Sequence, residues 1–250
     1  MKRTKYTKQD YHDHLKYEHH LSTLSTYLRE IVFGGTDGII TTFAVVAGFS
    51  GAQGTDASVT IPFLTVLLFG FANLFGDAAS MGLGNFLSVR ADQDVYQGEK
   101  NKELKEIKEH PEMEREETIH ILIERGFNQK QAEEMTKLYE LNHDYWLEFM
   151  MNQELEMPNP EGENAVFTGI ATFIAFIIFG LIPLIPYVVI GQSDNTFFFS
   201  ISFTFLALVL LGILRWKVTT QTIYRTIGES VLLGGVAAAI AYFVGTFFRI

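Results

Sequence analysis

Five long apolar runs constrain the fold of this chain more than any other feature of its sequence. A helix needs about 20 mostly apolar residues to cross the roughly 30 Å hydrocarbon core of a bilayer. The runs cover residues 31–51, 62–89, 165–190, 196–214 and 227–248. A large soluble helical core is the alternative, but a run such as FTGIATFIAFIIFGLIPLIPYVVI is too long and too uniformly apolar for it. We therefore predict an all-α membrane protein with five transmembrane helices.

The charge of the chain is concentrated between the second and third runs. Residues 92–163 hold 20 Asp and Glu against 8 Lys and Arg, whereas the rest of the chain is nearly neutral. We therefore expect a tail at 1–30, transmembrane helices 1 and 2 within 31–91, an acidic helical metal-binding domain at 92–163, and transmembrane helices 3 to 5 within 164–250. The sequence offers no generally basic surface for nucleic acid. It also has no cysteine, which excludes disulfides and thiolate metal sites.

Lys and Arg alternate between the two sides of the predicted membrane. Six precede the first span, none lies in the loop after it, and Arg215, Lys217 and Arg225 lie between the fourth and fifth spans. Cytoplasmic loops are enriched in Lys and Arg. We therefore expect the N-terminus and the acidic domain in the cytoplasm and the C-terminus on the opposite side. No cleavable signal pattern is seen, which fits a bacterial inner membrane or a vacuolar membrane.

Within the acidic block, prolines and capping residues predict several helices. Pro111 should end the continuation of the second span, Gly126 should cap the next helix, and Asn128 should begin one or two more. Carboxylates recur there at helical spacing, and a Met pair precedes the last of them. The candidate metal ligands are Glu103, Glu106, Glu114, Glu117, Met150, Met151 and Glu154. Convergent carboxylates suit a divalent cation, and a thioether favours a transition metal such as Fe²⁺; for most acids of the block, a solvated face is the alternative.

A second pattern in the block competes with this interpretation. Glu117 and His120, and again Glu140 and His143, form Glu-x-x-His pairs, which is the ligand spacing of ferritin-like di-iron bundles. Two further helices would have to supply one carboxylate each. Such a site would make the protein a membrane-tethered di-iron oxidoreductase with ferroxidase activity.

Polar side chains recur inside the first two predicted spans. Asp37 stands in the sequence GGTDGII, and Thr41 follows it by four residues. The second span carries a stripe of residues four apart: Asn73, Asp77, Met81 and Asn85. A charge near the bilayer centre costs about 2.5–3.5 kcal/mol on insertion scales and usually marks an ion path or a proton relay. A hydrogen bond between spans, or a position at the membrane interface, is the structural alternative.

Small residues at spacing four accompany these polar groups. Gly34 and Gly38 in the first span, and Ser80, Gly84 and Ser88 in the second, would allow a neighbouring helix to approach closely. We expect each set to mark a helix contact.

Four segments resemble the signatures of one family. They are DGIITTFAVVAGFSGA in the first span, DAASMGLGNFLSVRADQD in the second, WLEFMMNQELEMPNP before the third and GESVLLGGVAAAIAYFVG in the last. Together they resemble the vacuolar iron transporter family over about residues 29 to 248. The resemblance implies a homodimer, not an enzyme, that exports Fe²⁺ and often Mn²⁺ from the cytosol in exchange for protons. The metal is substrate, and no prosthetic group is implied.

The resemblance also assigns residues. The translocation path would run between subunits, with Asp37 and Met81 as membrane ligands, and the family's cytoplasmic ligands match the seven candidates above. The sequence departs from some members at Asn73, where they have a carboxylate that Asp77 would replace, and at Asn85, where a Glu is usual. Both departures concern the choice of ion and the proton coupling.

Transport is therefore the leading hypothesis. The ferroxidase is one alternative, and a non-transporting metal sensor that docks a partner through the acidic block is another.

Overall fold

A computed structural model of the chain describes residues 22–52, 63–191, 193, 195–219 and 221–248. Most of the predicted tail, and all of the loop predicted after the first span except Ala52, lie outside these residues. The chain separates into two compact units. One comprises Met1–Gly84 and Phe167–Ile250, here called the span unit, and the other comprises Asn85–Val166, here called the acidic unit. Each is described by itself.

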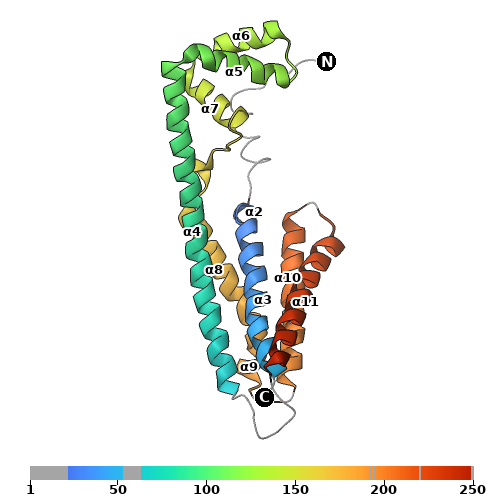
Figure 1. The fold of residues 1–250 in the computed structure, drawn as a ribbon. Helices are drawn as coiled ribbons and strands as arrows, with labels where there is room; N and C mark the ends of the chain where they lie inside the picture. Colours follow the sequence, from blue (N-terminus) through green and yellow to red (C-terminus); the bar gives the residue numbers. More distant parts are fainter. Residues whose placement is uncertain (1–21, 53–62, 192, 194, 220, 249–250) are drawn as a thin grey trace. The chain divides into compact units, whose positions relative to one another are not determined.

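The described residues contain five helices long and apolar enough to cross a membrane, as predicted. They are α3 (Leu28–Ala52), α4 (Phe63–Glu109), the segment from α8 (Ala165–Leu181) to α9 (Ile185–Val189), α10 (Thr196–Val218) and α11 (Ile223–Phe247), with a short α2 (Thr23–Thr26) before them (Figure 1). The chain is therefore an integral membrane protein with an all-helical fold.

One span is interrupted in a way that the hydropathy pattern did not predict. Between α8 and α9 the chain forms the 3-10 turn η2, Ile182–Leu184. Pro183 lies in this turn and Pro186 in the first turn of α9. A proline has no backbone N–H to give to the preceding turn, so it breaks the α-helical hydrogen-bond ladder. The carbonyl of Pro183 accepts a hydrogen bond from the Ser200 hydroxyl at 2.7 Å.

Helix α3 is the central helix of the span unit. It contacts α10 and α11, and α8 lies along it as well (Figure 1). A Cβ on Gly34 would lie 2.6 Å from the carbonyl oxygen of Thr172, and one on Gly38 would lie 2.5 Å from that of Phe176. The prediction that these two glycines admit a neighbouring helix is confirmed, and the neighbour is α8.

The second set of small residues behaves differently. Ser80, Gly84 and Ser88 are exposed, and a Cβ on Gly84 would meet no described atom within 4 Å. The residue of α4 that packs against α8 is Gly82, where a Cβ would lie 2.9 Å from that of Phe173. Among the described residues no helix therefore packs at Gly84, and the helix contact expected there stays a prediction.

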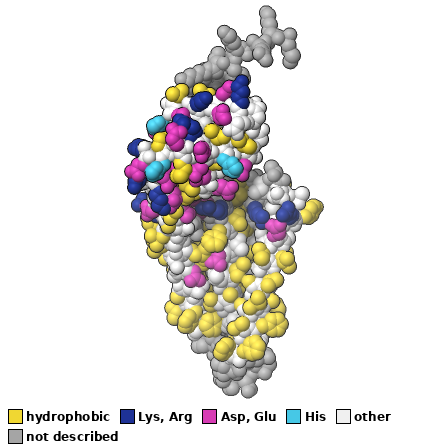
Figure 2. Space-filling model, turned by 45° about the horizontal axis from the view of Figure 1, so that its top comes forward, with side chains coloured by type: hydrophobic (Ala, Val, Ile, Leu, Met, Phe, Trp, Pro, Cys, Tyr) yellow, Lys and Arg dark blue, Asp and Glu magenta, His cyan; other side chains and the backbone are white. Residues whose placement is uncertain are grey.

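Large apolar side chains cover much of the surface of the span unit. On α4 they include Leu64, Leu68 and Leu83, and on α11 Leu232 and Phe243, each more than 60% exposed. Figure 2 shows such side chains spread over this unit, while charged side chains gather on the acidic unit. Soluble proteins rarely expose so much apolar surface to water, whereas in a membrane lipid tails would cover it.

In the acidic unit the predicted helix ends are confirmed. Helix α4 ends at Glu109, and α5 (Pro111–Glu124) begins with proline at its first position. Gly126, at φ +99°, follows α5 and donates its N–H to the carbonyl of Ile123, and Phe127 donates to Leu122. These two bonds form a Schellman cap, whose left-handed residue favours glycine.

Two further caps separate the rest of the block. Asn128 and Gln131 form a capping box at the start of α6 (Gln129–Glu140), and the side chain of Asn142 caps α7 (His143–Gln153). The segment that the sequence left as one helix or two is therefore two. The turn η1 (Pro160–Gly162) then leads toward α8.

We predict that Gly38→Ala lowers the melting temperature of the detergent-solubilised protein, because the new Cβ would press on a backbone carbonyl of α8 that cannot turn aside. Gly235→Ala is the matched control, since a Cβ there meets no described atom within 4 Å and alanine is the better helix former by about 1 kcal/mol. Equal melting temperatures for both variants would contradict the close packing of α3 on α8.

Candidate metal sites

Three of the predicted carboxylates meet in the acidic unit. One carboxylate oxygen each from Glu103, Glu114 and Glu154 lies within 4.8 Å of the others. Glu103 belongs to α4, Glu114 to the first turn of α5, and Glu154 caps the C-terminus of α7. Because Pro111 turns the chain sharply between α4 and α5, two acids eleven residues apart in sequence come to face each other. The three side chains can hold a divalent cation through carboxylate oxygens.

Burial makes this cluster unusual. Glu103 is 3% exposed and Glu114 is 1% exposed, and ionised carboxylates are almost never buried unless they are paired. Yet Glu103 Oε1 and Glu114 Oε2 have no hydrogen-bond partner. Buried acceptors without a donor need an explanation, and a cation between them would supply one.

Electrostatics within the cluster favour bound protons when no cation is present. Burial raises the pKa of Glu103 to about 8, helped by a hydrogen bond to Glu114 and by repulsion from Glu114, Glu154 and Glu106. Burial also raises the pKa of Glu114, although the hydrogen bond from Glu103 opposes that rise. The pKa of Glu154 rises to about 7 through burial and repulsion from Glu117, Glu114 and Glu106. A proton on Glu103 is therefore shared with Glu114.

The remaining two candidate acids flank the cluster without joining it. Glu106 is exposed and Glu117 is half-buried. Both repel Glu114 and Glu154 electrostatically, so their charges lie near the three converging carboxylates.

The two candidate methionines lie in the core of the acidic unit. Met150 and Met151 are both fully buried and pack with Tyr96, Ile107 and Trp146. The Met150 sulfur accepts a hydrogen bond from the Thr118 hydroxyl at 3.2 Å. Thr118 itself accepts one from the Trp146 indole N–H at 2.8 Å. Sequence spacing gave no sign of Thr118 or Trp146, because their contact joins residues 28 positions apart.

Solvent reaches the cluster from the Glu154 side. Glu154 lines a cavity of about 500 Å³ together with Glu124, Arg125 and Glu156. Glu154 therefore belongs both to this cavity and to the cluster.

The structure does not assemble the di-iron alternative. Within the part of the chain described, the group of three converging carboxylates contains neither His120 nor His143. His120 is exposed and pairs with Glu124 at 3.3 Å. Glu140 forms an ion pair with Arg115. The two Glu-x-x-His pairs follow from the high Glu content of the helices, and the prediction of a di-iron site from them is wrong.

In the span unit, Asp37 lines a cavity of about 770 Å³ with Arg29, Thr36 and Arg215 among its walls. Asp77 lies close enough to Asp37 to repel it electrostatically. The Thr41 hydroxyl donates to the backbone carbonyl of Asp37 at 2.8 Å, so it does not pair with the carboxylate.

The rest of the polar stripe on α4 is distributed around the core. Met81 is half-buried against the core formed by residues such as Phe176. Asn73 lines a separate, largely apolar cavity of about 530 Å³, and its Nδ2 is buried without a hydrogen-bond partner. Asn85 is the first residue of the acidic unit. The stripe is therefore not one continuous polar surface.

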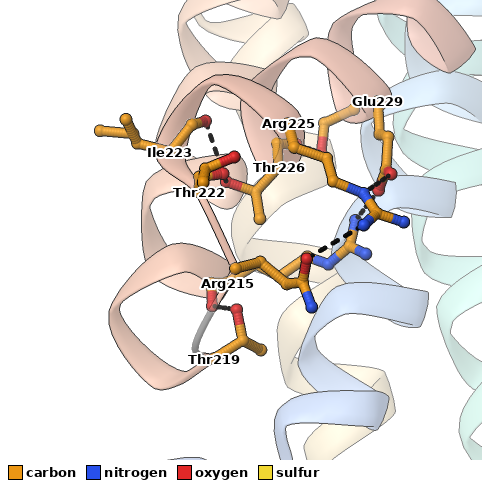
Figure 3. A network of polar contacts seen from close by, with 9 residues as sticks. Arg215, Thr219, Thr222, Ile223, Arg225, Thr226 and Glu229 are labelled. Carbon is orange, nitrogen blue, oxygen red and sulfur yellow. Dashed lines mark hydrogen bonds and ion pairs between the residues drawn. The ribbon is translucent and has the colours of Figure 1, made fainter.

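A network of polar contacts ties the ends of α10 and α11 together (Figure 3). Glu229 accepts from Arg215 at 2.8 Å and from Arg225 at 2.9 Å, and Arg225 also donates to Gln221 at 3.1 Å. Arg215 and Arg225, two of the three cations between the fourth and fifth spans, are thus both held by the Glu229 carboxylate. Arg215 also lines the Asp37 cavity, which brings a fixed positive charge to its wall.

We predict that the metal-free acidic unit loses stability as pH rises from about 5 to 8. Between the usual Glu value of 4.5 and the raised pKa values of about 8 for Glu103 and about 7 for Glu154, the folded state binds more protons than the unfolded state, so the free energy of unfolding falls with pH. In a Trp216→Phe background Trp146 is the sole tryptophan, and its emission during thermal unfolding reports this directly. A midpoint that rises over this pH range would contradict the buried cluster.

We also predict that Glu103→Gln raises the melting temperature of the metal-free protein at pH 8 and weakens Mn²⁺ binding by about tenfold or more. The amide removes a buried group whose ionisation is unfavourable, and it removes an anionic ligand. Glu116→Gln, at an exposed position of α5, is the matched control and should change neither quantity. Unchanged Mn²⁺ affinity in Glu103→Gln would exclude Glu103 from the site.

Known proteins are similar in sequence to this chain over nearly its whole length. The profile of the VIT family matches residues 28–246. The chain is 32% identical to vacuolar iron transporter 1 of Arabidopsis thaliana, over 94% of this chain and 90% of the relative. It is 33% identical to the vacuolar iron transporter of Plasmodium berghei, over 96% of this chain and 88% of the relative. Vacuolar iron transporter 1 of Oryza sativa is 29% identical over 92% of this chain. The chain therefore belongs to the VIT family, as its resemblance in sequence indicated.

Proposed function

We propose that this protein is a proton-coupled transporter that moves Fe²⁺ and Mn²⁺ out of the cytosol, into a vacuole or out of the cell. The relatives are named as iron transporters rather than as enzymes, and the described residues contain five helices long and apolar enough to cross a membrane. The observation that carries the proposal is the cluster of Glu103, Glu114 and Glu154, in which two buried carboxylates have oxygens without a partner.

In this proposal the acidic unit lies in the cytoplasm and gathers the metal. The three converging carboxylates form the centre of the site, and Glu106, Glu117, Met150 and Met151 complete the set. Carboxylate oxygens alone would suit Mg²⁺ and Ca²⁺ equally well, whereas the buried thioethers add softer ligands that favour a transition metal. Metal ions must displace the protons that the raised pKa values retain, so metal binding releases protons.

The membrane path is proposed to use Asp37, Asp77 and Met81. A carboxylate inside a span is a functional group by default, because inserting its charge is unfavourable, and Asp77 adds a second one nearby. Metal and protons would compete for the same carboxylate oxygens, which couples export of one to entry of the other.

A second copy of the chain is proposed to complete the path. Ser80 and Gly84 are exposed on α4, and no described atom lies within 4 Å of a Cβ on Gly84; small residues at this spacing are typical of helix contacts in lipid. The homodimer would place the path between subunits.

The proposed orientation follows from the distribution of Lys and Arg. The cations Arg215, Lys217 and Arg225 mark the cytoplasmic side, with the C-terminus opposite, in a vacuolar or bacterial inner membrane.

We predict that Asp37→Asn abolishes Fe²⁺ uptake into proteoliposomes under a pH gradient and leaves the oligomeric state unchanged. The amide keeps the shape of the side chain. It cannot bind and release a proton in exchange for metal, and it offers no anionic ligand. Asp94→Asn, the same change at an exposed position of α4, should transport normally. Full transport by Asp37→Asn would refute its role in the path.

The same assay separates the rival functions. Uptake of Fe²⁺, Mn²⁺, Zn²⁺ and Ca²⁺ by the unsubstituted protein gives the selectivity among ions. Metal binding without flux of any ion would indicate the non-transporting sensor.

A further inference from the structure

One buried hydroxyl in the acidic unit, that of Thr118, lies within hydrogen-bonding distance of three polar atoms. Thr118 is fully buried on α5. Its Oγ1 lies 2.7 Å from the carbonyl oxygen of Glu114, 3.2 Å from the Met150 sulfur and 2.8 Å from the Trp146 indole nitrogen. Neither the sequence pattern nor the proposed transport cycle assigns a role to this hydroxyl.

The chemistry of the three neighbours limits what Thr118 can do. An indole N–H can only donate, and a hydroxyl has one proton and two lone pairs. Trp146 therefore occupies a lone pair and fixes the oxygen in place. The single proton can point to the carbonyl oxygen of Glu114 or to the sulfur of Met150, but not to both at once.

The location of this contact connects it to the carboxylate cluster. Thr118 follows Glu114 by one helical turn on α5, and Met150 precedes Glu154 by one turn at the end of α7. Glu114 meets Glu154 in the cluster, and one turn away Thr118 meets Met150. The flexible thioether of a methionine, which has three rotatable bonds, is thus held by a hydroxyl at a fixed position beside the acidic ligands.

We propose that Thr118 is a positioning residue that sets the preference of the acidic unit for soft over hard cations. Without metal the hydroxyl lies within hydrogen-bonding distance of both the Met150 sulfur, at 3.2 Å, and the Glu114 carbonyl, at 2.7 Å, and it keeps the sulfur in place. When a soft transition metal binds through that sulfur, the hydroxyl turns its proton to the Glu114 carbonyl, already at 2.7 Å, so no buried group loses its partner. Mg²⁺ does not use sulfur and gains nothing from this exchange. The inference rests on the proposed function, in which Met150 is a ligand.

The test compares Co²⁺ with Mg²⁺ on the full chain in detergent. In the Trp216→Phe background, quenching of Trp146 emission follows Co²⁺ binding, and competition with Co²⁺ gives the Mg²⁺ affinity. Thr118→Val replaces the hydroxyl by a methyl group of similar size, and Thr118→Ser keeps the hydroxyl. Thr136→Val is the matched control, because Thr136 is equally buried and donates to a backbone carbonyl at 2.9 Å on α6.

We expect Thr118→Val to lower the preference for Co²⁺ over Mg²⁺ by about tenfold, with Thr118→Ser and Thr136→Val unchanged. Met150→Leu should cause the same loss, and the double variant Thr118→Val/Met150→Leu should lose no more than either single one, because both act on one sulfur. Should Thr118→Val not fold, Thr118→Ala removes the same hydroxyl with less crowding and carries the same expectation.

Four results would overturn the inference. Equal weakening of Co²⁺ and Mg²⁺ by Thr118→Val would show a merely structural hydroxyl. A loss of preference in Thr136→Val would show a general effect of core substitution. If Met150→Leu lowers the preference and Thr118→Val does not, the inference fails while the proposed ligand set stands. If Met150→Leu has no effect either, the ligand set itself is wrong.

Discussion

The repulsion between two buried carboxylates is the constraint on which the acidic unit depends. Glu103 and Glu114 face each other almost without solvent, where a charge is strongly disfavoured. A proton shared between them relieves only part of this repulsion, because each still has one buried oxygen without a donor. They are held together by the surrounding core of Tyr96, Trp146 and Met150 and by the Pro111 turn. The favourable packing of that core keeps the acids close when no cation is bound.

This arrangement gives up stability to obtain a binding site. With a pair of neutral side chains in place of Glu103 and Glu114, the folded protein would be more stable at pH 8. The raised pKa of Glu103 shows how unfavourable its ionisation is. Protons compensate at low pH, and a divalent cation would compensate at high pH. In the proposed function, the same exchange between proton and metal takes place in the span unit at Asp37.

In the span unit, polar side chains from different helices line one cavity. Gly34 and Gly38 allow the backbones of α3 and α8 to approach closely, whereas the cavity that Asp37 lines includes no described residue of α8. At the end of α10, Glu229 fixes Arg215, and that arginine lines the same cavity as Asp37. Opposite charges thus face the cavity from different helices.

Much of this could be predicted from local sequence, and the rest could not. Runs of apolar residues, Pro111, Gly126 and Asn128 act through their own or adjacent turns, so the spans and the helix ends of the acidic unit were predicted correctly. Spacing also placed Glu103, Glu114 and Glu154 among the candidates. It could not choose between these acids and the Glu-x-x-His pairs, because that choice depends on how helices pack.

Contacts between distant residues account for what the sequence left unseen. The hydrogen bond from Trp146 to Thr118 joins two helices whose pairing no local pattern encodes. The packing of Gly82 in place of Gly84 depends on how α4 is rotated against α8, which spacing alone does not determine.

The central claim is that the partnerless oxygens of Glu103 and Glu114 are a metal site. An anomalous difference map from crystals of the protein grown with Co²⁺ tests it most directly. We predict a peak within bonding distance of carboxylate oxygens from Glu103, Glu114 and Glu154. Peaks confined to other acidic residues, with these three carboxylates free of metal, would contradict the account.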